Sequence, residues 1–169
     1  MPVNLELKVK INSFNKIKAL LENNKAEFKG ILKQKDIYYK ISSGLLKLRI
    51  ENGNQSIIKY LRDENSKNRF SDYAFINLNN YDGEKFFSGI LNVEAVVEKK
   101  RLLYLYDNTR IHLDNVKNLG YFLELETLVL FGKPDARKRF DIIKKLLKLD
   151  EYEQIKKSYR DLIINSVKK

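Results

Sequence analysis

Apolar and polar residues alternate along most of this chain, and the alternation predicts a protein built mainly from β-strands. In residues 4–11, for example, the odd positions are apolar and the even positions are polar. Successive side chains of a strand point to opposite faces, so each such segment offers one apolar face and one polar face. Counting these segments gives about eight strands. We place them at residues 4–11, 26–39, 45–51, 55–61, 69–78, 93–106, 110–116 and 121–129.

Helical spacing of apolar residues is confined to a few segments. It predicts a helix over residues 14–23, with Ser13 as the N-cap. Residues 81–91 are expected to form a short helix or a structured loop. Two C-terminal helices are predicted, one from Pro134 to Leu149 and one over residues 150–167. Amphipathic helices of this kind can cover the apolar faces of the strands.

Polar and glycine-containing stretches mark where the strands end or are interrupted. Asn52-Gly53 is a strong hairpin signal, and Leu119-Gly120 marks another turn. Within the predicted strand 26–39, residues 33–36 are polar and interrupt the apolar pattern. We interpret these four residues as an irregularity in that strand.

Carboxylates gather near the end of the predicted sheet. Glu124 and Glu126 share one face of the strand 121–129, and Asp114 lies on the preceding strand. Several carboxylates on neighbouring strand faces could bind a hard divalent cation through oxygen. The alternative is the solvated outer face of an antiparallel sheet, which shows the same alternation.

The composition adds a strong positive charge to this picture. The 169 residues are expected to form one domain, residues 1–169. They include 33 Lys and Arg against 22 Asp and Glu, a net charge of +11 that indicates an anionic partner. The lack of cysteine excludes disulfides and thiolate metal sites. No secretory signal or transmembrane stretch is found, so we expect a cytoplasmic protein without a membrane partner.

Basic residues recur in pairs on the polar faces of the predicted strands. These pairs are Lys8 and Lys10, Lys47 and Arg49, and Lys99 and Arg101. If the sheet curls with its charged faces inward, the interior becomes a basic tunnel. Buried charge is costly unless it is paired, so such a tunnel would hold a polyanion, with the carboxylates holding a divalent metal. This chemistry suits a nucleoside triphosphate or an inorganic polyphosphate.

Six motifs in this order resemble the CYTH proteins, also called triphosphate tunnel metalloenzymes, and among them the class IV adenylyl cyclases. The family's opening E-x-E-x-K corresponds to residues 4–8, where Asn4 replaces the first glutamate. The other five matches are Lys47-Leu48-Arg49, Lys59, Lys99-Lys100-Arg101, the stretch from His112-Leu113-Asp114 through Leu119-Gly120 to Glu126, and Ser158 to Leu162. The chain departs from the family's R-x-E-x-E-like strand at residues 69–74, where Asp72 could supply one acid.

The resemblance implies a fold and a set of site residues. The fold would be α+β, an eight-stranded antiparallel closed β-barrel with helices packed outside. The expected ligands of Mg²⁺ or Mn²⁺ are Glu6, Asp114, Glu124 and Glu126. The expected triphosphate ligands are Lys8, Lys47, Arg49, Lys59, Lys99, Arg101 and Arg110. Further candidates are Lys10, Arg69, Asp72 and Tyr159. No residue is assigned as a catalytic acid or base, and we interpret His112 as a structural strand residue.

The implied activity is conversion of ATP into 3′,5′-cyclic AMP and pyrophosphate. Two alternatives stay open: hydrolysis of inorganic or thiamine triphosphate in the same tunnel, and non-catalytic binding of a nucleotide or polyphosphate. A nucleic-acid partner is disfavoured, because it would need the basic residues on an outer face. A homodimer is left open as the assembly.

Overall fold

The computed structural model describes residues 3–62 and 70–167, with the side chains of residues 61, 62 and 70–72 left aside. The strands are β1 (Val3–Ile11), β2 (Glu27–Tyr39), β3 (Leu45–Glu51), β4 (Asn54–Arg62), β5 (Phe70–Asn77), β6 (Val93–Tyr106), β7 (Thr109–Val116) and β8 (Gly120–Leu128). The helices are α1 (Asn15–Asn23), α2 (Gly83–Phe87), α3 (Lys133–Leu146), the 3₁₀ helix η1 (Leu149–Glu151) and α4 (Tyr159–Val167). No helix in these described ranges is long and apolar enough to cross a membrane.

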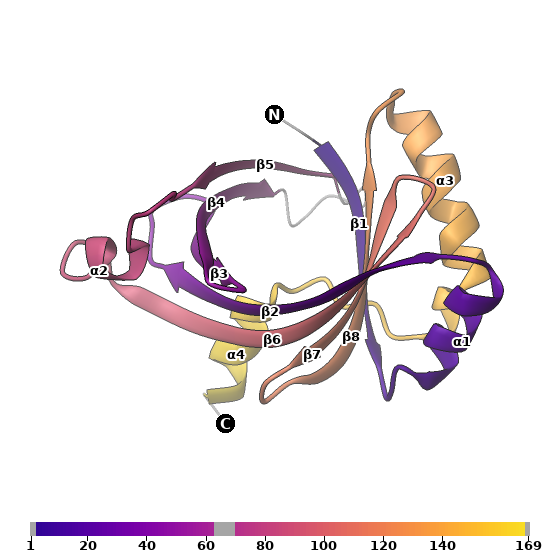
Figure 1. Cartoon of the computed structure of the whole chain (residues 1–169), viewed down its shortest axis with the longest axis horizontal. Helices are drawn as coiled ribbons and strands as arrows, with labels where there is room; N and C mark the ends of the chain where they lie inside the picture. The colour runs from indigo at the N-terminus through magenta and orange to yellow at the C-terminus, as the bar shows by residue number, and fades with distance from the viewer. Residues whose placement is uncertain (1–2, 63–69, 168–169) are drawn as a thin grey trace.

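The eight strands close into a barrel. Their order around it is β1-β5-β4-β3-β2-β6-β7-β8, and every neighbouring pair is antiparallel. In Figure 1 the long strands β2 and β6 run side by side across the molecule, and the hairpin of β7 and β8 crosses them at a steep angle. The predicted closed antiparallel barrel of the α+β class is therefore confirmed.

The main apolar core lies outside the barrel, between its wall and two helices. The odd-numbered residues 5–11 of β1 are buried there together with Ile17 and Leu21 of α1 and Phe140 and Ile143 of α3. Figure 1 shows α1 and α3 on this side, well away from α2. Because the apolar faces of the strands point outward to the helices, the polar faces point inward.

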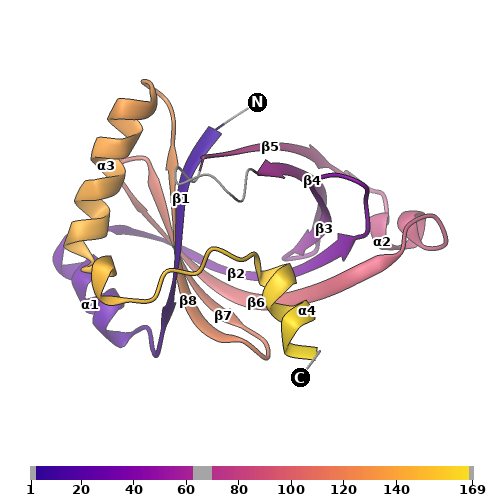
Figure 2. The ribbon, with the colours of Figure 1, turned by 180° about the vertical axis from the view of Figure 1, so that it is seen from behind.

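A smaller apolar cluster fills one end of the barrel interior. Tyr38, Val97, Val116 and Phe122 pack there against Tyr159, the first residue of α4. Figure 2 shows α4 lying across the strands β2 and β6 at this end. The cluster and α4 therefore close one end of the interior.

The prediction of one continuous helix over residues 150–167 is wrong. After η1 the chain is extended, and only Tyr159–Val167 is helical. The reason lies in the backbone of β1, whose pairing with the described residues of β5 covers Val3–Leu5. Farther along, Lys10 donates its backbone N–H to the Glu153 carbonyl, and the Lys8 carbonyl accepts from Ile155. Exposed backbone groups of a strand need such partners, and an extended segment supplies them.

Candidate functional site

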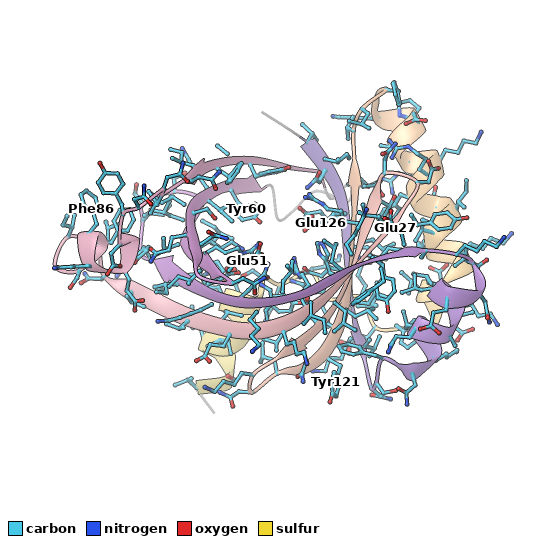
Figure 3. The ribbon with its side chains drawn as sticks, viewed as in Figure 1. Glu27, Glu51, Tyr60, Phe86, Tyr121 and Glu126 are labelled. Carbon is cyan, nitrogen blue, oxygen red and sulfur yellow. The ribbon has the colours of Figure 1, made fainter. Side chains whose placement is uncertain are left out.

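Polar side chains from most strands converge inside the barrel. They line two adjoining cavities of about 70 Å³ and about 360 Å³, which share Arg49, Tyr60, Arg101 and Glu126. Figure 3 shows Tyr60 and Glu126 within the ring of strands, with Phe86 and Tyr121 outside it. The charged interior expected from the alternation is thus formed.

One ion cluster is centred on Asp36 of β2, whose side chain is fully buried. Lys47 and Lys99 each place Nζ 3.0 Å from Asp36 Oδ2. Arg49 donates from Nε to Oδ1 at 2.7 Å and from Nη2 to Oδ2 at 2.8 Å. Three cations from β3 and β6 therefore surround one carboxylate. We call these four residues the Asp36 cluster.

Burial and the neighbouring charges shift the pKa values in the Asp36 cluster. Burial raises the pKa of Asp36, but Arg49, Lys47 and Lys99 outweigh it and hold that pKa well below its ordinary value. Burial, with help from Arg49, lowers the pKa of Lys47 to about 7. Burial also lowers the pKa of Lys99. Three cations share one carboxylate, so the cluster is suited to a further anion.

A second cluster joins a histidine to two carboxylates. His112 of β7 and Glu124 and Glu126 of β8 each offer one ligand atom, and these atoms all lie within 4.8 Å of one another. His112 Nδ1 is 3.9 Å from Glu124 Oε2 and 3.7 Å from Glu126 Oε1. The strand register sets this arrangement, because His112 and Glu124 are direct cross-strand partners. We call these three residues the His–Glu cluster.

Internal cations balance the carboxylates of the His–Glu cluster. Lys8 Nζ is 3.1 Å from Glu124 Oε1, and Arg101 Nη2 is 2.7 Å from Glu124 Oε2. Arg110 Nη2 is 2.9 Å from Glu126 Oε2. Burial raises the pKa of Glu124, but Lys8, His112 and Arg101 lower it to well below its ordinary value. Both carboxylates are therefore ionised at neutral pH and available as metal ligands.

Glu6 of β1 brings a further carboxylate close to this cluster. It lines the smaller cavity and is the direct cross-strand partner of Glu126. Side chains in such a pair lie about 5 Å apart at Cβ, and like charges there repel unless a cation intervenes. The pairing therefore favours a cation between the two strands.

Asp114 is placed differently from the expectation. Its oxygens accept from Arg101 Nε at 2.7 Å and Nη2 at 2.6 Å, and Oδ2 also accepts from the Tyr159 hydroxyl at 2.9 Å. Both oxygens are thus engaged, and Asp114 falls outside the His–Glu cluster that the described residues form. The geometry makes Asp114 a residue that positions Arg101, and its role as a metal ligand stays a prediction.

Of the predicted triphosphate ligands, Lys8, Lys47, Arg49, Lys99 and Arg101 line the smaller cavity and Arg110 lines the larger one. Lys59 is exposed on the outer side of β4, because it pairs with the outward-facing Leu46 and the next residue, Tyr60, faces inward. The prediction that Lys59 lies in the tunnel is therefore wrong.

The further candidates have varied positions. Lys10 donates to the Leu119 carbonyl, and its Nζ lies 4.2 Å from the centre of the Phe122 ring. Tyr159 faces the smaller cavity, and its ring centre lies 4.0 Å from Lys8 Nζ. Arg69 and the side chain of Asp72 lie outside the described residues.

Sequence reasoning missed Asp36 and the aromatic Tyr38 and Tyr60. All three face the interior, and Asp36 lies in the stretch that we interpreted as an interruption of the strand. In the structure β2 is continuous through this stretch. The alternation of Gln34, Asp36 and Tyr38 with outward residues was the signal that could have revealed them.

The donor set fits a divalent cation. Two ionised carboxylates and one imidazole are common ligands of such ions. Four buried polar atoms of residues that line the larger cavity have no hydrogen-bond partner among the described residues: Asn4 Oδ1, Gln34 Oε1, Arg110 Nε and His112 Nδ1. Glu124, Glu126 and His112 are the residues that would hold the ion.

A closed antiparallel barrel with an internal cation cluster beside a carboxylate cluster defines a class of proteins that enclose a polyanion and a metal. The chain belongs to the CYTH family, whose domain model matches residues 3–159. CYTH proteins are typically metal-dependent enzymes that act on triphosphates held in the barrel.

Solved structures agree with this assignment. The PH1012 protein from Pyrococcus horikoshii OT3 is 25% identical with a TM-score of 0.81, over 94% of this chain and 98% of that one. The PH1819 protein from the same organism is 25% identical with a TM-score of 0.76, over 96% and 99%. A candidate adenylate cyclase from Vibrio parahaemolyticus is 17% identical with a TM-score of 0.74, over 95% and 97%, and shows the fold alone. A search of curated proteins found no match.

Proposed function

We propose that this protein is a metal-dependent adenylyl cyclase of the class IV type, converting ATP into 3′,5′-cyclic AMP and pyrophosphate. The observation that carries the proposal is the adjacency of the two ion clusters. Lys99 contacts Asp36, and Arg101, two residues along the same face of β6, contacts Glu124. A spacing of two residues along a strand is about 6.6 Å. A chain of phosphates can therefore contact both clusters at once.

The Asp36 cluster would bind the phosphates. Arg49 offers a planar pair of donors suited to two phosphate oxygens, while Lys47 and Lys99 act as point charges. In the structure all three bond to Asp36. A bound phosphate shares these cations with the carboxylate, so the site is preorganised and its charges are already paired before the substrate enters.

The His–Glu cluster would hold the metal beside the phosphates. A bound divalent ion supplies Lewis-acid chemistry at phosphate oxygens and lowers the pKa of a coordinated hydroxyl group. Glu124 presently bonds to Lys8 and Arg101. Once Glu124 binds an ion, these two cations become available to phosphate oxygens. Metal and triphosphate should therefore strengthen each other's binding.

The larger cavity supports a nucleoside triphosphate over inorganic triphosphate. Its volume is about 360 Å³, and Arg49, Arg101 and Glu126 connect it with the smaller cavity. Its lining includes the apolar and aromatic side chains Leu32, Ile58, Tyr60, Tyr73, Phe75 and Leu103. A base and ribose can contact such a surface while the phosphates lie among the cations.

Hydrolysis of inorganic or thiamine triphosphate is the second candidate. It is supported by the smaller cavity, whose cations Lys47, Arg49 and Lys99 bind phosphates without regard to what the chain of phosphates carries. In that reaction a water molecule would be activated in place of a ribose hydroxyl.

Product analysis separates these reactions. The protein is incubated with ATP and Mn²⁺ or Mg²⁺, and the products are resolved by ion-exchange chromatography and ³¹P NMR. We expect cyclic AMP and pyrophosphate in equal amounts. Release of orthophosphate would show that the protein is a triphosphatase and not a cyclase. Tight ATP binding without any product would indicate a non-catalytic binder. GTP, tripolyphosphate and thiamine triphosphate define the substrate range, and Lys59→Ala is the control for Lys47→Ala.

A further inference from the structure

We propose that His112 is a metal ligand and that the site binds a first-row divalent transition ion in preference to Mg²⁺. The inference takes the location of the metal from the proposed function and adds the chemical class of the ion. It can be tested without ATP, so the two proposals can fail separately.

The first observation is the unused nitrogen of His112. The side chain is only 5% exposed, and Nδ1 has no hydrogen-bond partner within the described part of the chain. Its distances of 3.9 Å and 3.7 Å to the two carboxylates are too long for hydrogen bonds. Buried polar atoms normally have a partner, and one without any calls for an explanation.

The second observation is the convergence of three ligand atoms. One ring nitrogen of His112 and one oxygen from each of Glu124 and Glu126 lie within 4.8 Å of one another. Donor atoms around one transition ion with bonds of about 2.1 Å lie roughly 3.0 to 3.4 Å apart. Atoms that are 4.8 Å apart therefore need to approach by about 1.4 to 1.8 Å, which rotations of the side chains can provide. The β7–β8 ladder keeps His112 opposite Glu124 while they do so.

The donor types decide which ion is preferred. Mg²⁺ and Ca²⁺ take oxygen ligands almost exclusively, whereas imidazole favours later transition ions. The carboxylates already have Lys8, Arg101 and Arg110 as charged partners. The imidazole nitrogen has no hydrogen-bond partner among the described residues. A site of two carboxylates and one imidazole should thus favour a later ion such as Co²⁺ over Mg²⁺.

The competing explanation gives His112 a purely ionic role. An imidazolium between Glu124 and Glu126 would lower the repulsion between the two carboxylates without binding any metal. This explanation predicts that the metal, when bound, has oxygen ligands only. It also predicts that replacing His112 changes the affinities for Co²⁺ and Mg²⁺ by the same factor.

The chain contains a single histidine, so pulsed EPR gives a direct test. Mn²⁺ is added to the nucleotide-free protein, prepared once with natural nitrogen and once with ¹⁵N-labelled histidine. We expect an imidazole nitrogen coupling that changes with the isotope, and it can only come from His112. A bound ion without this coupling overturns the inference and leaves the proposed function standing. Failure of the free protein to bind Mn²⁺ also overturns the inference.

Calorimetry on a variant gives the selectivity. His112→Asn offers an amide oxygen close to the place of Nδ1, which makes the donor set entirely oxygen. We expect its affinity for Co²⁺ to fall at least about tenfold, while that for Mg²⁺ changes less than about twofold. Gln34→Met is the control, because Gln34 is a buried polar residue of the larger cavity outside the His–Glu cluster. Equal losses for both ions in His112→Asn would contradict the inference. If that variant does not fold, the EPR measurement on the unaltered chain decides.

Discussion

The two ion clusters inside the barrel differ in their balance of charge. In the Asp36 cluster three cations surround one buried carboxylate. In the His–Glu cluster the carboxylates Glu124 and Glu126 lie together, and Glu6 is the cross-strand partner of Glu126. The first cluster gathers cations around one carboxylate, and the second brings carboxylates together. Buried ions are stable only when they are paired, so the first group favours an anion and the second a cation.

The comparison shows how one barrel can bind a polyanion and a metal ion side by side. Each cluster carries its own counterions, which keep the interior folded without a ligand. Arg101 connects the clusters, because it bonds to Asp114 and Glu124 from the strand that also carries Lys99. The following predictions test whether the clusters are distinct.

The largest effect is expected from Asp36→Asn, which leaves three buried cations without their carboxylate. We expect the free energy of unfolding to fall by about 3–5 kcal/mol, measured by urea denaturation. Added tripolyphosphate should restore part of it, because an anion then replaces the missing charge. The control is Glu151→Gln, whose pair with Lys16 is exposed and should not affect the urea midpoint. Equal effects of the two changes would contradict the central role of Asp36.

Glu126→Gln should separate activity from stability. We expect turnover to fall by about a hundredfold or more, because one ligand of the metal is lost. Without metal the melting temperature should stay within about 3 °C, since the ion pair with Arg110 is partly exposed and repulsion from the neighbouring carboxylates is relieved. The stabilisation by added Mn²⁺ should shrink. Unchanged turnover would remove Glu126 from the site.

The pH dependence of anion binding tests the Asp36 cluster. Since the pKa of Lys47 is lowered to about 7, this lysine is charged below pH 7 and neutral above it. Affinity for tripolyphosphate should therefore fall as the pH rises, by up to about tenfold for each unit above 7. Isothermal titration calorimetry between pH 6 and 9 measures it. Lys47→Met should remove this part of the dependence, and the same slope in both proteins would refute the assignment.

The smallest effect is expected from Tyr159→Phe. The variant loses the hydroxyl that donates to Asp114 at 2.9 Å and keeps the ring beside Lys8. We expect a loss of about 1–2 kcal/mol in the free energy of unfolding, because the acceptor is a buried carboxylate. Urea denaturation measures the change. A larger loss together with lost anion binding would show that the hydroxyl also contacts the phosphates.

Local periodicity was enough to predict most of the fold. Strand β6, for instance, has the predicted bounds of residues 93 and 106. The alternation depends only on neighbouring residues, and each strand shows it. The helix predicted for the segment after η1 was wrong, because this segment pairs with the backbone of β1, more than a hundred residues away in the sequence. Helical spacing of its apolar residues gave no sign of that partner.

The site was less predictable, because several of its contacts also join residues that are far apart in the sequence. Glu124 and Glu126 share a face because of the period of two, which the sequence displays. The burial of Asp36 depends on cations from β3 and β6, so its polar surroundings looked like an irregularity. Lys59 matched a motif by order along the chain, but the β3–β4 register turned it outward. Asp114 matches the family's aspartate in residue type, but the sequence does not show that Arg101 and Tyr159 donate hydrogen bonds to its oxygens.

Paired calorimetry on Lys47→Ala and Glu126→Gln tests the division between the clusters most directly. Tripolyphosphate and Mn²⁺ are titrated separately into each variant and into the unaltered protein. We expect Lys47→Ala to lower the tripolyphosphate affinity at least about tenfold and to leave the Mn²⁺ affinity within about twofold. Glu126→Gln should lower the Mn²⁺ affinity at least about tenfold and leave the tripolyphosphate affinity within about twofold. If each variant lowers both affinities by the same factor, the interior is a single undivided site and the account is wrong.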